Sequence, residues 1–268
     1  MDRRVPRAPR HFPSFYTHPI LPILMDASTE SLARQWLQAA RHTLILTGAG
    51  VSAESGVPTF RDALTGLWAR FDPEDLATEA AYRDHPGLVW DWYEMRREMV
   101  RGVAPNPAHL AIARWTAAHP DQVTLVTQNV DGLHQQAGSG HVIELHGNLF
   151  RNSWLNGCGR CETHRTDATH PPSCTACGAL LRPAVVWFGE DLPRVALYRA
   201  EHAAETADVC LVVGTSGLVY PAAGLPGRAK AAGAKVIVVN PQPSALDETA
   251  DAVLQAPAGE CLPRLLAL

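Results

Sequence analysis

The chain has 268 residues, of which 46% are hydrophobic, enough for one large core or for a core with a small satellite domain. Its 23 Lys and Arg residues against 27 Asp and Glu residues give a net charge of −4. This balance excludes a general electrostatic attraction to nucleic acid or to an anionic membrane. The sequence also lacks an apolar run of the roughly 18 to 20 residues that a membrane helix needs, so no membrane partner is expected.

The first 25 residues differ in composition from the rest of the chain. They are rich in Arg and Pro and contain a single acid, Asp2. They fit a disordered or loosely packed extension, a strap over the surface, or a start misassigned upstream of Met25. An Arg-rich, acid-poor segment also resembles a transit peptide, although such peptides are usually rich in Ser. The expected location is therefore cytoplasmic, or the mitochondrial matrix if this segment is a transit peptide.

Order is expected from residue 26, where capping residues precede Leu32, Trp36 and Leu37 on one face of a helix. Buried parallel strands are predicted by four short apolar runs, at residues 43–47, 123–127, 209–213 and 235–240. Strands alternating with crossovers predict an α/β fold with a doubly wound, parallel, Rossmann-like sheet. Each run ends in a polar or glycine-rich cluster, and the carboxyl ends of such strands face one ligand cleft.

A glycine turn, Gly48-Ala49-Gly50, follows the first predicted strand, and Ser52 lies just beyond it. Glycine lets a backbone approach a phosphate closely, and a hydroxyl can donate to it, although a tight turn after a buried strand needs glycine as well. The continuation to Phe60-Arg61 and Gly66-Leu-Trp68 lacks the spacing of the ordinary dinucleotide fingerprint. It is similar to the NAD-binding signature of the sirtuin family.

Further motifs that resemble those of sirtuins follow in order along the chain. They are Thr127-Gln-Asn-Val-Asp131, Leu145-His-Gly-Asn148, Val186-Trp-Phe-Gly-Glu190, Gly214-Thr-Ser216, Val219-Tyr-Pro-Ala222 and Asn240-Pro241. The resemblance, to bacterial-like members, runs from Leu32 to the C-terminus. It implies NAD-dependent removal of acyl groups from protein lysines, with nicotinamide, O-acyl-ADP-ribose and free lysine as products. It also implies a catalytic core over 26–268, in which a helical insert at 62–105 and a zinc-ribbon insert at 147–185 form a smaller domain.

Four of the six cysteines form two close pairs with twelve residues between them, namely Cys158-x2-Cys161 and Cys174-x2-Cys177. Two such knuckles supply four thiolates for a tetrahedral zinc ion, a closed set that leaves no position for a substrate, so one structural zinc is predicted. A nucleic-acid-binding zinc ribbon would need a basic stripe, but Arg165 is the only Lys or Arg between the pairs. The pattern is that of a reducing compartment and not of a disulfide framework.

The resemblance implies the residues of the catalytic and NAD sites. His146 is the expected general base, because its motif position, among twelve histidines, matches the family's catalytic one and its unperturbed pKa lies near neutrality. Asn129 is expected beside it as a second catalytic residue. The residues implied for NAD binding are Gly48, Ala49, Gly50, Ser52, Phe60, Arg61, Trp68, Gln128, Asn129, Asp131, His146, Gly214, Thr215, Ser216, Asn240 and Ala258. For Phe60, ordinary core packing is the alternative interpretation.

In the mechanism implied by the resemblance, NAD is consumed as a co-substrate so that a stable amide can be cleaved. The acyl oxygen attacks the nicotinamide ribose as nicotinamide leaves, and a base then activates a ribose hydroxyl that opens the intermediate. The segment Val186–Glu190 resembles the one that pairs its backbone with the substrate peptide by β-augmentation, with Val219 on the other side. The full set implied for the substrate is Ala63, Tyr93, Arg96, Val186, Trp187, Phe188, Gly189, Glu190 and Val219.

Tyr93 and Arg96 lie three residues apart on a helix predicted to begin at Pro86. A phenol and a planar guanidinium together suit a carboxylate. The alternative interpretation is a solvated helix laced by Glu94, Arg97 and Glu98. The Tyr-x-x-Arg spacing resembles the pair that marks class III, desuccinylase-type sirtuins, and Ala63 is expected to leave room for a longer acyl chain. Succinyl and malonyl groups are therefore the favoured substrates, with acetyl also accepted.

Two other classes of function are weighed against this one. A sirtuin-like fold can serve as an NADase or a mono-ADP-ribosyltransferase, or as a nonenzymatic NAD sensor. The first needs no acyl-lysine channel, and the second needs neither His146 nor both Asn129 and Asp131. The expected partners are acylated-lysine proteins or peptides, and not nucleic acid or membrane. The oligomeric state stays open, with a monomer favoured.

Overall fold

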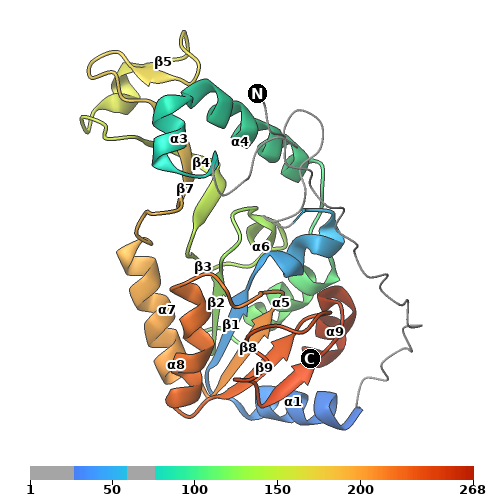
Figure 1. The fold of residues 1–268 in the computed structure, drawn as a ribbon. Coiled ribbons are helices and arrows are strands. Elements are labelled where there is room, and N and C mark those ends of the chain that lie inside the picture. The colour runs from blue at the N-terminus through green and yellow to red at the C-terminus, as the bar shows by residue number, and fades with distance from the viewer. Residues whose placement is uncertain (1–26, 59–75) are drawn as a thin grey trace, which may run out of the picture.

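The computed structural model describes residues 27–58 and 76–268. Its centre is a six-stranded parallel sheet with the strand order β10-β9-β8-β1-β2-β3 (Figure 1). The strands are β1 (Thr43–Thr47), β2 (Val123–Thr127), β3 (Val142–Glu144), β8 (Val209–Val213), β9 (Lys235–Val239) and β10 (Ala252–Leu254). The predicted α/β fold with a parallel sheet is confirmed. The predicted extension, residues 1–25, lies outside the described residues.

Helices cover both faces of the sheet, as Figure 1 shows. On one face lie α1 (Ala27–Ala39), α5 (Pro107–Ala118) and α9 (Ala258–Leu265), and on the other α7 (Arg194–Thr206) and α8 (Leu225–Ala231). All five residues of β1 are buried, which explains its continuous apolar run. In the described residues no helix has the length and apolar character needed to cross a membrane.

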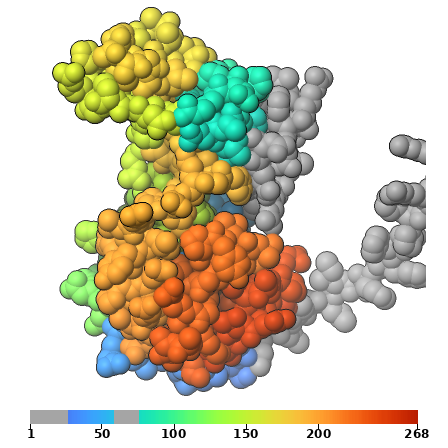
Figure 2. Space-filling model, turned by 60° about the vertical axis from the view of Figure 1, so that its left-hand side comes forward, coloured from blue at the N-terminus to red at the C-terminus, as the bar shows by residue number. Residues whose placement is uncertain are grey.

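A smaller lobe stands on one end of the sheet domain, and Figure 2 shows it joined to that domain by a narrower neck. It contains α3 (Glu79–Asp84), α4 (Pro86–Arg101), β4 (Gly147–Trp154), η3 (Cys161–His164), β5 (Arg165–Thr166), β6 (Ser173–Cys174) and β7 (Leu181–Val185). β4 and β7 pair antiparallel, and this lobe has its own core around Tyr82, Trp92, Tyr93 and Trp187. The residue limits of the two inserts, 62–105 and 147–185, stay predictions.

The buried Arg97 ties helix α4 to strand β4. Its Nε donates to the Leu149 carbonyl at 2.5 Å, and its Nη2 donates to Asn152 Oδ1 at 2.5 Å. The side chain also pairs with Glu94, as the ion-pair-laced helix predicts, but it is 5% exposed, so the interpretation of this helix as solvated is wrong at Arg97. A buried guanidinium with carbonyl and amide partners holds the helix at a fixed position on the hairpin. The face of α4 that carries Tyr93 and Arg96 is positioned by this anchor.

Candidate active site

The candidate site lies at the point in the parallel sheet where the order of strand addition reverses. β1 pairs with β2 on one side and with β8 on the other, so the chain winds outward from this point in both directions. In open α/β sheets, ligands bind outside the carboxyl ends of the strands at such a point. The clusters predicted to converge there do lie at the ends of neighbouring strands, with Gly48 after β1, Gln128 after β2, Gly214 after β8 and Asn240 after β9.

Three glycines bring the ends of β1 and β8 into direct contact. A Cβ atom on Gly48 would lie 2.8 Å from the Gly214 carbonyl oxygen, and one on Gly50 would lie 2.8 Å from the Gly214 Cα. Gly214 has a φ of +62°, and its own Cβ would lie 2.2 Å from the backbone nitrogen of Val51. The Gly50 N–H donates to the Gly214 carbonyl at 2.8 Å. Close packing of two strand ends thus requires these glycines, independently of any phosphate.

Beyond the glycines, η1 (Ala49–Ser55) places the Ser52 hydroxyl at the centre of a buried polar cluster. Ser52 Oγ donates to Asp131 Oδ2 at 2.8 Å and accepts from Asn129 Nδ2 at 3.1 Å. Asp131 Oδ1 accepts from the Leu133 N–H at the start of α6 (Leu133–Gln136), at 2.9 Å. Burial raises the pKa of Asp131, and the bonds from Leu133 and Ser52 and the charge of Arg96 offset part of this rise. The cluster holds Asn129 and Asp131 in fixed orientations.

His146 lies between β3 and β4, and its tautomer follows from one contact. Its Nδ1 lies 2.9 Å from the Gln128 carbonyl oxygen. Because a carbonyl only accepts, Nδ1 carries the proton and Nε2 carries the lone pair. Burial lowers the pKa of His146, although the bond to Gln128 acts in the opposite direction. The imidazole is therefore neutral at physiological pH, with Nε2 able to accept a proton.

The other residues predicted to bind NAD meet along the same edge. Gln128 Nε2 donates to Thr215 Oγ1 at 3.1 Å, and Asn240 Nδ2 donates to the Thr215 carbonyl at 2.9 Å. Ser216 is exposed, whereas Ala258 is buried at the start of α9, which packs against η1. The structure thus brings these side chains together. Of the other predictions, Phe60, Arg61, Ala63 and Trp68 lie outside the described residues.

The segment predicted to bind the peptide, Val186–Glu190, follows β7 directly. The Val186 N–H donates to the His146 carbonyl at 2.9 Å, which joins this segment to the candidate base. The Phe188 N–H donates to the Ala77 carbonyl at 2.9 Å, and the Phe188 side chain is exposed. Val219 is also exposed, in the loop between β8 and η4 (Ala222–Gly224).

Tyr93 and Arg96 occupy one region of α4 beside this segment. The Tyr93 hydroxyl accepts from Trp187 Nε1 at 2.9 Å, and burial raises its pKa to about 12, so it stays protonated. The Arg96 guanidinium lies 4.9 Å from the centre of the Trp92 ring. Burial lowers the pKa of Arg96, and the opposing influences of Tyr93 and Asp131 place it within electrostatic reach of the polar cluster. The pair thus adjoins the segment through Trp187.

Sequence reasoning missed Arg182 on β7, which is 7% exposed. It pairs with Glu190 through both terminal guanidinium nitrogens, with Nη2 at 3.0 Å from Glu190 Oε2, and Nη2 also donates to the Val185 carbonyl at 2.8 Å. Its Cζ lies 3.3 Å from the centre of a Trp187 ring. A basic residue inside an otherwise apolar strand was the signal in the sequence. The sequence could not identify Glu190 as the partner of Arg182, because a turn of the chain after β7 brings Glu190 back against this strand.

Two histidines without a role predicted from the sequence lie behind the polar cluster. His109 and His134 are fully buried, with ring centroids 4.9 Å apart, and His134 Nε2 lies 2.9 Å from Thr47 Oγ1. Burial lowers the pKa of His109 to about 4 and that of His134 to about 3, so both are neutral. They form a polar but uncharged layer between Ser52 and β1.

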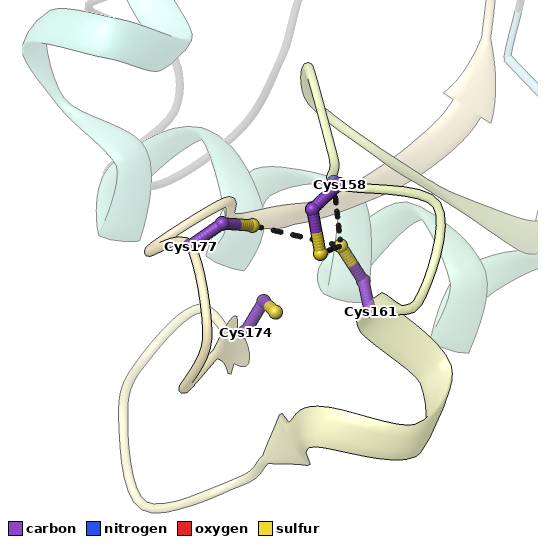
Figure 3. A group of neighbouring side chains, drawn as sticks. All are labelled: Cys158, Cys161, Cys174 and Cys177. Atoms are coloured by element: carbon purple, nitrogen blue, oxygen red, sulfur yellow. Dashed lines mark hydrogen bonds between the residues drawn. The ribbon is translucent and has the colours of Figure 1, made fainter.

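The four predicted zinc ligands meet in the small lobe, where Figure 3 shows their side chains around a common centre. All four Sγ atoms lie within 4.8 Å of one another. Cys161 Sγ lies 3.7 Å from the Sγ atoms of both Cys158 and Cys177. Zinc bonds to sulfur of about 2.3 Å in a tetrahedron put the sulfur atoms about 3.8 Å apart. The cluster therefore fits a closed, structural zinc site.

Comparisons with known proteins agree with this geometry. The Sir2 family model matches residues 48–221. A Ralstonia nicotianae protein named NAD-dependent protein deacylase is 70% identical over 242 residues, which cover 90% of this chain and 98% of the relative. The crystal structure of a Sir2 homolog–NAD complex is 43% identical, with a TM-score of 0.78 and coverage of 88% of this chain and 92% of that one. A structure of Sir2 bound to acetylated peptide is 30% identical, with a TM-score of 0.75 and coverage of 87% and 94%. The sirtuin resemblance is confirmed, and the chain belongs to the Sir2 family.

Proposed function

We propose that this protein is an NAD-dependent protein-lysine deacylase that favours succinyl and malonyl groups and also accepts acetyl groups. The reaction yields nicotinamide, O-acyl-ADP-ribose and free lysine, and its substrates are acylated proteins or peptides. The name of the Ralstonia relative supports the deacylase activity, and the neighbours that hold NAD or an acetylated peptide support the two substrates. The acyl preference is the finer part of the proposal and has its own support.

The arrangement at the strand ends supports the chemistry. Asn129 and Asp131, oriented by Ser52, would hold the nicotinamide and its ribose, the part of NAD that would be attacked by the acyl oxygen as nicotinamide leaves. His146 Nε2 then takes a proton from the ribose hydroxyl that opens the intermediate. Because Nδ1 donates to the Gln128 carbonyl, the positive charge that forms on the ring is stabilised by that carbonyl dipole. No serine or cysteine nucleophile is needed, since NAD supplies the electrophile.

The observation that carries the acidic acyl preference is the position of Tyr93 and Arg96. A buried, protonated phenol and a partly buried guanidinium lie together beside the peptide segment. Both donate hydrogen bonds, and a carboxylate only accepts them, so the two side chains match the end of a succinyl or malonyl chain. An acetyl group offers no such partner and gains nothing from the pair.

The test compares kcat/KM for matched succinyl and acetyl peptides in wild type and Arg96→Met. Removing the guanidinium leaves the acyl carboxylate desolvated without a partner, which typically costs about 2 to 5 kcal/mol. We therefore expect desuccinylation to fall by on the order of tenfold to a few thousandfold, and deacetylation far less. Arg96→Lys should restore part of the loss, because an ammonium makes no two-pronged contact. Tyr93→Phe should act in the same direction with a smaller effect.

Arg101→Met is the matched control, since Arg101 lies on the same helix and pairs with Glu98 at the exposed surface. It should leave the ratio of the two activities unchanged. Equal losses of both activities in Arg96→Met would make Arg96 a structural residue and refute the acidic preference. Mass spectrometry of the products identifies the reaction itself. ADP-ribose without O-acyl-ADP-ribose, or ADP-ribosylated protein, would replace the deacylase by an NADase or a mono-ADP-ribosyltransferase.

A further inference from the structure

The peptide segment carries one side chain that points away from the peptide and into the small lobe. Trp187 is 2% exposed, and its indole Nε1–H donates to the Tyr93 hydroxyl at 2.9 Å. In a backbone-pairing segment, the side chain at this position needs only to fill the core, which Phe or Leu would do. The indole instead donates its single hydrogen bond to Tyr93, the residue proposed to bind the acyl carboxylate.

That hydrogen bond limits where the Tyr93 proton can lie. A phenol oxygen carries one proton and accepts through its lone pairs, and the hydroxyl otherwise rotates to suit its neighbours. A donor that occupies an acceptor position directs the proton away from itself. Donation into the oxygen also polarises the O–H bond, so the phenol becomes a stronger donor to a third group. Two successive hydrogen bonds, from the indole N–H to the phenol and from the phenol O–H to the carboxylate, then strengthen each other.

We propose that Trp187 is a specificity-determining residue that positions the Tyr93 hydroxyl to donate to the carboxylate of an acidic acyl group. This inference depends on the proposed acidic acyl preference. Trp187 does not touch the acyl group and acts through Tyr93. An acetyl group has no carboxylate to accept the phenol proton, so the indole N–H affects selectivity more than the reaction as a whole.

Three residues hold Trp187 in this position, two at its ring and one at its backbone. The Arg182 guanidinium lies 3.3 Å from the centre of one of its rings, and the Tyr82 ring lies 5.1 Å away, centroid to centroid. Glu190, which pairs with Arg182, accepts the Trp187 backbone N–H through Oε2 at 2.8 Å. Backbone and ring are therefore both fixed, as a residue that orients another must be. The ring contacts use the π-face and not the N–H, so a Phe at this position retains them in part.

The test is Trp187→Phe, which removes the N–H donor and keeps an aromatic ring against Arg182. We measure kcat/KM for matched succinyl and acetyl peptides with the full chain. The succinyl-to-acetyl ratio should fall about three- to tenfold, the effect of one lost hydrogen bond. A loss shared by both substrates reports disturbance of the peptide segment and cancels in the ratio. In a Tyr93→Phe background, the same substitution should leave the ratio unchanged, because the group that it positions is gone.

Trp115→Phe is the matched control. Its buried Nε1 has no hydrogen-bond partner in the part of the chain that the structure describes, and it lies in the core of the sheet domain. It should leave the ratio unchanged. An unchanged ratio in Trp187→Phe, or an equal fall in the Tyr93→Phe background, overturns the inference, while Arg96→Met in the same assay still tests the acyl preference. A wild-type enzyme without succinyl activity overturns both, and the wild-type arm alone reveals it.

Discussion

At the scale of single residues, the hydrogen bond from His146 to the Gln128 carbonyl determines which nitrogen can act. We expect His146→Ala to lower deacylation by about two to four orders of magnitude, the usual contribution of a general base. The folded variant should keep its zinc, because the four cysteines lie in the small lobe, away from His146 in the sequence. Activity within tenfold of wild type would remove His146 from the mechanism.

The same residue gives a pH dependence with a definite sign. Burial lowers the pKa of His146 below its ordinary value of 6.5, and the base works only when neutral. Activity should therefore be retained as the pH falls to 6.5 and be lost only as it falls through the lowered pKa. The acid limb of kcat/KM should have a midpoint below 6.5 in wild type and be absent from the residual activity of His146→Ala. A midpoint above 6.5 would contradict the buried, neutral imidazole.

Motif position identified His146 from the sequence, but its tautomer could not be predicted. The deciding partner is a backbone carbonyl 18 residues away on a different strand end, and every residue has such a carbonyl. The same holds for Ser52, which was predicted as a phosphate donor and in the structure orients Asn129 and Asp131. Residue type and spacing predict which groups gather, whereas hydrogen-bond direction depends on the fold.

At the scale of elements, the Arg182–Glu190 pair closes the peptide segment onto β7. Arg182→Met would leave the Glu190 carboxylate without its buried partner, which typically costs about 3 to 5 kcal/mol of stability. Because the whole segment loses support, we expect succinyl and acetyl activities to fall together, in contrast to the selective loss in Arg96→Met. Thermal unfolding and the two kcat/KM values measure both effects.

The double variant Arg182→Met with Glu190→Gln is the control for the unpaired charge. It should recover part of the lost stability, because an amide is cheaper to bury than a carboxylate. Selective loss of desuccinylation in Arg182→Met would show instead that this arginine acts on the acyl group.

The elements differed in how well the sequence predicted them. The strands at 43–47, 123–127 and 209–213 match the structure end to end. Those at 43–47 and 209–213 are buried along their whole length, and the strand at 123–127 is buried over its last three residues. The run 235–240 ends one residue early, since Asn240 turns to bind the Thr215 carbonyl. β3 and β10 have three residues each, too few to show a period. β4 pairs with β7 through a register shift between Asn148 and Asn152, which breaks the alternation expected of a hairpin.

At the scale of the whole molecule, the zinc cluster supports the segment 158–177 of the small lobe, whose residues are mostly exposed. We expect Cys158→Ser to lose zinc and to lower the melting temperature together, because metal binding and local folding are one equilibrium. In a chain of this size about 1 kcal/mol shifts the melting temperature by about 2 to 4 °C, so a loss of several kcal/mol is readily measured. Metal analysis and thermal unfolding on one preparation give both values.

Cys210→Ser provides the comparison for this prediction. Cys210 is fully buried in β8 and lies outside the cluster, so its replacement can destabilise the sheet without removing the metal. Stoichiometric zinc and unchanged melting in Cys158→Ser would refute the four-cysteine site.

The base and the acyl-reading pair are carried by different elements. His146 lies at the junction of β3 and β4, whereas Tyr93 and Arg96 lie on α4, which Arg97 fastens to β4 of the small lobe. Under the proposed roles, the machinery that cleaves NAD and the machinery that chooses the acyl group can be exchanged separately. A change of acyl preference would then require substitutions on one face of α4 and at Trp187, with the residues at the strand ends unchanged.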